Sequence, residues 1–183
     1  MQKVNQQNDT NNVYRYIVGF TFHNDFLKIK RRGFLKGCVE KMLYIRDIER
    51  IIENTLEEHK ISIDYVFNNT LPAPMSFNVS TNTLKFNYLQ INGYIANINF
   101  KIKETNEDCV KLILYRQLGY YLVFKNNKHD LRVLKYFEDD EKAEFLAKIE
   151  NNAWDLGRTL VPERLVNSYD QVREIEKTLL KVH

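Results

Sequence analysis

One stretch of the chain, LILYRQLGYYLVF at residues 112–124, has the spacing of a metal-binding helix. Arg116 and Tyr120 lie one helical turn apart, and Gln117 directly follows Arg116. In an H-E-x-x-H helix, histidines at the two outer positions bind one zinc ion, and the glutamate activates the bound water. Here the arginine stays protonated, a tyrosine seldom loses its proton near pH 7, and an amide cannot take a proton from water. The stretch is therefore either a coincidental pattern or a former metal site whose chemical groups have been replaced.

Further segments occur around this stretch in a recognisable order. A helical stretch, an extended stretch and a hairpin-like stretch precede it, and two short motifs follow it. The segments are residues 48–58, KISID at 60–64, MSFNVSTNTLKFNYLQ at 75–90, RQLGYYLVF at 116–124, ENNAW at 150–154 and TLVP at 159–162. This series resembles the ImmA/IrrE-like metallopeptidases, a family known from mobile-element and stress regulators. The resemblance covers roughly residues 40 to 166 and leaves residues 1–37 unexplained. The alternative is that unrelated amphipathic helices show the same order of segments by chance.

The resemblance implies a degenerate zinc site. The matching positions are Arg116, Gln117 and Tyr120, together with Glu150, which with Ala153 fits the motif of the third ligand. Because only the glutamate is an ordinary metal ligand, we expect neither a metal nor another cofactor, and no catalytic residue. Arg116 could form an ion pair with Glu150 where the metal would lie, or it could point to solvent.

The hydrophobic periodicity predicts an α+β fold. By resemblance, this is a zincin-like domain in which helices pack on a small antiparallel sheet, with a β extension before it. Asp139 and Asp140 favour a helix start electrostatically, and Ser168 is a candidate N-cap. Predicted helices cover residues 38–58, 106 onward, 139–160 and 168–181, and predicted strands cover 61–67, a hairpin within 77–93, and 94–102.

The composition favours one compact domain. The chain has 183 residues and is 44% hydrophobic. We expect a polar tail at 1–12, a β extension at 13–37 and the metallopeptidase-like domain at 38–183. No apolar run has the length of a membrane span, and the first residues lack the apolar core of a secretion signal, so a cytoplasmic protein is expected. The two cysteines, Cys38 and Cys109, have no metal-ligand spacing and are expected to be reduced.

Three functions remain open at this stage. We favour a non-catalytic regulator or inhibitor from a phage or mobile element that binds a host or phage protein, for example a defence protein. A nucleic-acid-binding regulator is a second interpretation, because a basic cluster lies near the N-terminus, although the net charge is only +3. An active metallopeptidase is the third, with Glu150 joined by His129 or by carboxylates such as Asp139, Asp140 or Glu141. Candidate partner contacts are Lys28, Lys30, Arg31, Arg32, Tyr115 and Tyr121.

Overall fold

The computed structural model describes residues 42–126 and 131–180, and these residues form an α+β fold. The predicted α+β class is therefore confirmed, whereas the predicted tail and β extension at 1–37 lie outside the described residues. The elements are α2 (Ile45–Glu58), β1 (Asp64–Phe67), β2 (Met75–Asn78), β3 (Thr83–Phe86), α3 (Tyr88–Ile98), α4 (Asn106–Asn126), the short 3-10 helix η2 (Leu131–Lys135), α5 (Asp139–Arg158) and α6 (Glu163–Leu180).

The three strands form a mixed sheet with the order β1-β3-β2. β2 and β3 form the expected antiparallel hairpin, and Asn82 takes a positive φ of 50° in its turn. β1 pairs with β3 in parallel, so the prediction of a purely antiparallel sheet is wrong for this pair. The cause is the loop at 68–74, which reverses the chain and places β2 beyond β3. Asn87 holds this loop by donating hydrogen bonds to the carbonyls of Asn69 and Leu71.

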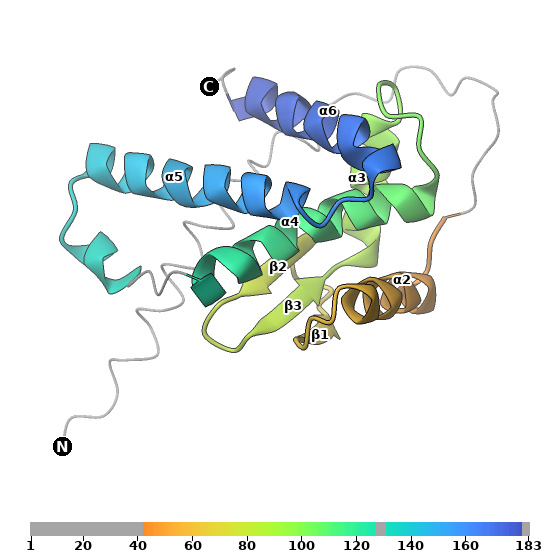
Figure 1. Ribbon diagram of the computed structural model, residues 1–183, viewed down its shortest axis with the longest axis horizontal. Coiled ribbons are helices and arrows are strands. Elements are labelled where there is room, and N and C mark those ends of the chain that lie inside the picture. Colours follow the sequence, from red (N-terminus) through yellow and green to blue (C-terminus); the bar gives the residue numbers. More distant parts are fainter. Residues whose placement is uncertain (1–41, 127–130, 181–183) are drawn as a thin grey trace.

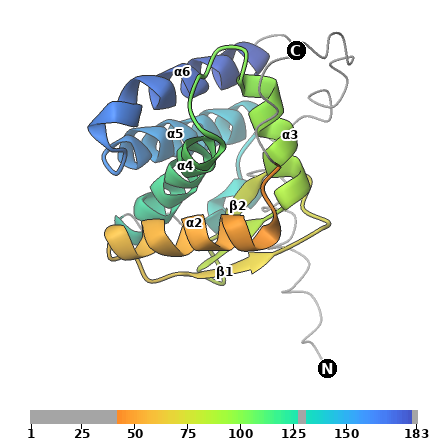
Figure 2. The same cartoon turned by 90° about the vertical axis from the view of Figure 1, so that its right-hand side faces the viewer.

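Helix α4 lies at the centre of the molecule. The sheet and α2 pack on one side of it, and α5 and α6 pack on the other (Figure 1). In the turned view, α3 lies at the edge of the molecule and α6 runs across the top (Figure 2). Nine consecutive residues of α4, 112–120, are buried, so this helix has no solvent-facing side over that stretch. A helix that is enclosed in this way belongs to the core of a domain.

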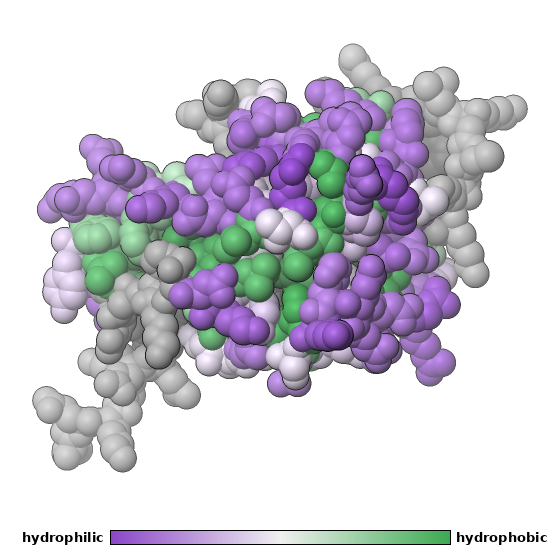
Figure 3. Space-filling view, viewed as in Figure 1, coloured by the Kyte–Doolittle hydropathy of each residue, from purple (hydrophilic) through white to green (hydrophobic). Residues whose placement is uncertain are grey.

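One face of the molecule combines polar and apolar surfaces. Polar side chains cover the upper part, over α5 and α6, and the lower part, over the sheet and α2 (Figure 3). An apolar band crosses the middle of this face, between these two polar regions. None of the helices in 42–126 and 131–180 has the length and apolar character needed to cross a membrane.

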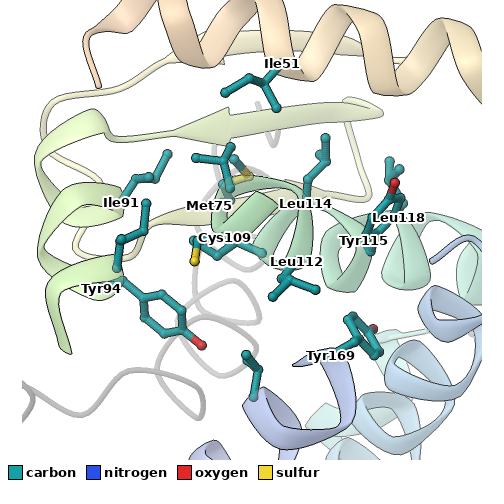
Figure 4. Packing of buried hydrophobic residues seen from close by; sticks show 14 of the residues in the cluster. Ile51, Met75, Ile91, Tyr94, Cys109, Leu112, Leu114, Tyr115, Leu118 and Tyr169 are labelled. Atoms are coloured by element: carbon teal, nitrogen blue, oxygen red, sulfur yellow. The ribbon is translucent and has the colours of Figure 1, made fainter. Parts of the chain in front are cut away.

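The core packs around α4 in two directions. Leu114 points from α4 toward the sheet and α2, whereas Leu112 points toward the side on which Tyr169 of α6 lies (Figure 4). Cys109 and Trp154 are also buried. Cys38 lies outside the described residues.

Close packing of α4 against α5 depends on two glycines. A Cβ atom on Gly119 would lie 1.8 Å from the carbonyl oxygen of Ala153, and one on Gly157 would lie 2.5 Å from that of Tyr115. These distances are far below van der Waals contact, so the two backbones approach as closely as they do only because both side chains are hydrogen atoms.

Three predicted elements differ from those observed. A hairpin was expected within 77–93 and a strand at 94–102, but 88–98 form helix α3, because Asn87 accepts a hydrogen bond from the backbone N–H of Leu89 and caps the helix. Helix α6 begins at Glu163, directly after Pro162, and not at Ser168. The Ser168 hydroxyl instead donates to Glu104, which fixes α6 to the loop before α4.

Candidate functional site

The candidate site is a buried ion cluster at the RQLGY segment, residues 116–120. Arg116 on α4 donates through Nη2 to Oε1 of Glu150 on α5, at 2.7 Å. Its Nη1 lies 2.8 Å from Oε2 of Glu176 on α6. Only 4% of the Arg116 side chain is exposed, and the exposed fractions of Glu150 and Glu176 are 14% and 11%. The predicted pair between Arg116 and Glu150 is thus present, and Arg116 does not point to solvent.

Two aromatic residues complete this cluster. The Tyr94 hydroxyl, on α3, donates to Oε1 of Glu176 at 2.6 Å. The guanidinium carbon of Arg116 lies 5.0 Å from the centre of the Trp154 ring, within the range of a cation–π interaction. Four helices, α3 to α6, therefore meet through one arginine and its partners.

The charges of the cluster determine the pKa values of its members. Burial alone would lower the pKa of Arg116, but the opposite charges of Glu176 and Glu150 outweigh it, and the pKa is raised. Burial raises the pKa of Glu176 despite the opposing effect of Arg116. Burial also raises the pKa of Tyr120, so its phenol stays protonated. One permanent cation thus faces two carboxyl groups, and the pKa of Glu176 lies above its ordinary value because its burial outweighs the effect of that cation.

Gln117, at the position of the general base, has a structural partner. Its Oε1 accepts a hydrogen bond from the backbone N–H of Phe77 at 3.1 Å. Phe77 lies on β2, an edge strand of the three-stranded sheet, where a backbone N–H that faces away from β3 needs another acceptor. The side chain of Gln117 is buried and held by this bond, so it connects α4 to the sheet.

The remaining predicted site residues fall into three groups. Tyr120 is buried beside Arg116. Tyr115 is fully buried, so its prediction as a partner contact is wrong for the folded chain. Tyr121 is only partly buried and packs edge-on against Phe77, with 5.8 Å between ring centres. The third group lies outside the described residues and comprises Lys28, Lys30, Arg31, Arg32 and His129.

The residues of this site do not fit a zinc ion. A zinc site needs three or four nitrogen, sulfur or carboxylate ligands. Glu150 and Glu176 converge, but the space between them holds a guanidinium group, which repels a metal cation. Within 42–126 and 131–180, no group of three histidine, cysteine, aspartate or glutamate residues could hold a metal ion. Asp139, Asp140 and Glu141 are exposed in the first turn of α5.

Comparisons of the chain with protein-family models, with curated proteins and with solved structures gave no match.

Glu176 and Tyr94 were missed by the analysis of the sequence. The resemblance ended near residue 166, before most of α6. One signal was present, because Glu176 follows directly on the apolar positions Tyr169, Val172 and Ile175 at helical spacing. A carboxylate at the border of an apolar helix face often indicates a buried cationic partner.

Two tyrosines of the core allow a matched test of this hydrogen-bond network. Tyr94→Phe removes a donor to a charged acceptor, so it is expected to lower the free energy of unfolding by about 1.5–3 kcal/mol. Tyr115→Phe removes a buried hydroxyl that has no hydrogen-bond partner among the described residues, so it is expected to be neutral or to stabilise by up to about 1 kcal/mol. Urea unfolding of both variants measures the difference. Equal losses would contradict the assigned role of Tyr94.

Proposed function

We propose that this chain is a non-catalytic protein-binding regulator or inhibitor built on a metallopeptidase-like scaffold. Its source would be a phage or mobile element, and its target a host or phage protein. The observation that supports the proposal is the ion cluster of Arg116, Glu150 and Glu176 at the position where the metal ligands of the resembled family would meet. Arg116, which occupies the position of a metal-binding histidine in that family, pairs with Glu150 and Glu176.

The chemistry of each position argues against hydrolysis by the mechanism of the resembled family. The guanidinium of Arg116 supplies a fixed positive charge and cannot activate a water molecule. The amide of Gln117 cannot accept a proton, and its oxygen is bound to the backbone of β2. The phenol of Tyr120 stays protonated in its buried position.

A surface for a protein partner lies close to this cluster. The second core cluster has an apolar rim of partly exposed residues on the hairpin, α4 and α5, including Val79, Tyr121, Phe124, Phe145 and Leu156. The apolar band in Figure 3 lies over the same part of the molecule, between α5 and the hairpin. Contiguous exposed apolar surface of this kind is typical of protein-binding sites. Tyr121 therefore remains a candidate contact.

Restoring the lost ligands tests the proposed scaffold. We expect the variant R116H/Q117E/Y120H, which keeps Glu150, to bind about one zinc ion per chain, the occupancy expected for a site with three protein ligands. The wild-type chain, purified without a histidine tag or chelator, is expected to contain almost none. Metal analysis of both proteins by mass spectrometry measures the ratio.

The control variant R116H/Q117E/Y120F lacks one histidine and should lose most of the bound zinc. Circular dichroism shows whether each variant is folded. A folded triple variant without zinc would contradict the metallopeptidase-like scaffold. Stoichiometric zinc in the wild-type chain, together with peptidase activity that a chelator abolishes, would contradict the non-catalytic function.

A further inference from the structure

Strand β1 forms an edge of the sheet that no further strand covers within residues 42–126 and 131–180. It pairs with β3 on one side only. The backbone N–H of Asn68, directly after β1, donates to the carbonyl of Phe86 on β3. Because successive N–H groups along a strand point to alternate sides, those of Tyr65 and Phe67 point away from β3. The outer edge of β1 therefore presents backbone groups with which another strand can pair.

A stripe of carboxylates runs along α2 beside this edge. Glu49, Glu53 and Glu57 follow one another at intervals of four residues, which places them on one side of the helix. The Tyr65 hydroxyl, on β1, donates to Oε1 of Glu53. This hydrogen bond, burial and the negative charges of Glu53 and Glu49 raise the pKa of Tyr65 to about 12. These three glutamates, the α2 acidic stripe, therefore lie alongside β1, which runs beside α2 in the turned view (Figure 2).

The α2 acidic stripe is unfavourable for the helix that carries it. Like charges four residues apart repel each other, and negative charges near the C-terminal end of a helix oppose its dipole. The last turn of α2 contains no basic residue, and no ion pair joins the stripe to a cation of the described residues. The stretch 45–67 holds six acidic and three basic residues, although the whole chain has a net charge of +3. Cations supplied by a partner would relieve this repulsion.

We propose that the outer edge of β1 binds an extended, basic segment of a partner protein, which adds to the sheet as a further strand. The backbone of that segment would pair with the outward groups of Tyr65 and Phe67. Alternate side chains of a strand lie on one face, roughly 6.4–6.8 Å apart, and neighbouring glutamates of the stripe are spaced about 6 Å along the helix. Lysine or arginine at every second position therefore matches the stripe in sign and in spacing.

The charge of this surface selects the occupant. An acidic strand would be repelled by the α2 acidic stripe, and so would the phosphate groups of a nucleic acid. Two copies of the chain that paired edge to edge through β1 would bring two stripes of the same charge together, which disfavours that dimer. The inference concerns a surface other than the apolar rim of the second core cluster, and it does not rest on the proposed function.

A labelled synthetic peptide of alternating lysine and threonine tests the proposal on the full chain. We expect fluorescence anisotropy at physiological salt to show saturable binding of one peptide per chain. The variant E49Q/E53Q/E57Q keeps polar side chains of the same shape and removes the three charges, so it should weaken binding by about fivefold or more. Circular dichroism shows whether the variant is folded.

A matched control removes the same number of charges elsewhere. Asp139, Asp140 and Glu144 are exposed on α5. D139N/D140N/E144Q should therefore change the affinity for the peptide by less than about twofold, because these positions lie outside the proposed surface.

Hydrogen exchange separates strand addition from a simple attraction of charges. When the peptide is bound, the amide protons of Tyr65 and Phe67 are expected to exchange at least about tenfold more slowly, because new hydrogen bonds protect them. Three results would overturn the proposal. These are an absence of saturable binding to the wild-type chain, equal losses of affinity in the two triple variants, and unchanged exchange at both amides in the bound state.

Discussion

Replacing Arg116 with methionine is expected to lower the free energy of unfolding by about 3–5 kcal/mol at pH 7. The reason is not the loss of two hydrogen bonds alone. Glu150 and Glu176 would remain in their buried positions without the cation that now lies 2.7 and 2.8 Å from them. Methionine fills much of the same volume, so the change tests charge more than packing. Urea unfolding at neutral pH measures the difference.

A second variant separates charge from packing. R116M/E150Q/E176Q removes the arginine and both carboxylates, so it is expected to recover most of the stability that R116M loses, since a buried charge cluster contributes little when it is removed as a whole. If the combined variant is no more stable than R116M, the cost comes from packing against Trp154 and not from uncompensated charge.

The pH dependence of R116M gives a further check. Burial already raises the pKa of Glu176 in the wild-type chain, and removal of Arg116 would raise it further. A carboxyl group whose pKa is raised on folding stabilises the fold below its unfolded pKa of about 4.3, and this contribution is lost as the pH rises through the folded pKa. R116M should therefore approach the stability of the wild type on acidification from pH 7 toward pH 4. A deficit that stays constant over this range would contradict the assignment.

The analysis of the sequence predicted the pair of Arg116 with Glu150 but missed Glu176, and there is a physical reason for this difference. Arg116 and Glu150 lie on long helices whose periodicity is clear, and the resemblance placed both at one site. Glu176 lies on α6, within the helix predicted at 168–181 but beyond residue 166, where the resemblance ends, so nothing assigned it to the site. The start of that helix was expected at Ser168 because serine is a frequent N-cap. Pro162, six residues earlier than that expected start, was interpreted only as a helix end, although proline is equally suited to the beginning of a helix.

The elements around the hairpin show where local patterns fail. Residues 94–102 are rich in isoleucine and aromatic residues, which favours a strand by propensity. Tertiary packing overrides this, because Ile91, Ile95 and Ile98 fall on one helical face and are buried together. The parallel pairing of β1 with β3 could not be derived from either strand, since it depends on the loop at 68–74 and on its hydrogen bonds to Asn87.

Replacing Gly119 with alanine is expected to lower the free energy of unfolding by about 3 kcal/mol or more. Alanine is the better helix former by about 1 kcal/mol, so an isolated helix would gain stability from this change. In the folded chain the new methyl group would lie 1.8 Å from the carbonyl oxygen of Ala153. That atom belongs to the backbone of α5, so the clash can be relieved only if α4 and α5 move apart, which exposes core surface and opens voids.

The matched control is Gly93→Ala on α3. The same substitution there introduces a methyl group with no neighbour within 4 Å among the described residues, so the helix propensity dominates and a gain of about 0.5–1 kcal/mol is expected. Opposite signs for the two variants in urea unfolding would show that the close approach of α4 to α5 determines the outcome. If G119A were as stable as G93A, the two helices would have to lie further apart than described. The leucine–glycine pair of the RQLGY segment would then have no packing role. If G119A instead lowers the free energy of unfolding, packing alone explains the glycine of this segment, whether or not the chain descends from an enzyme.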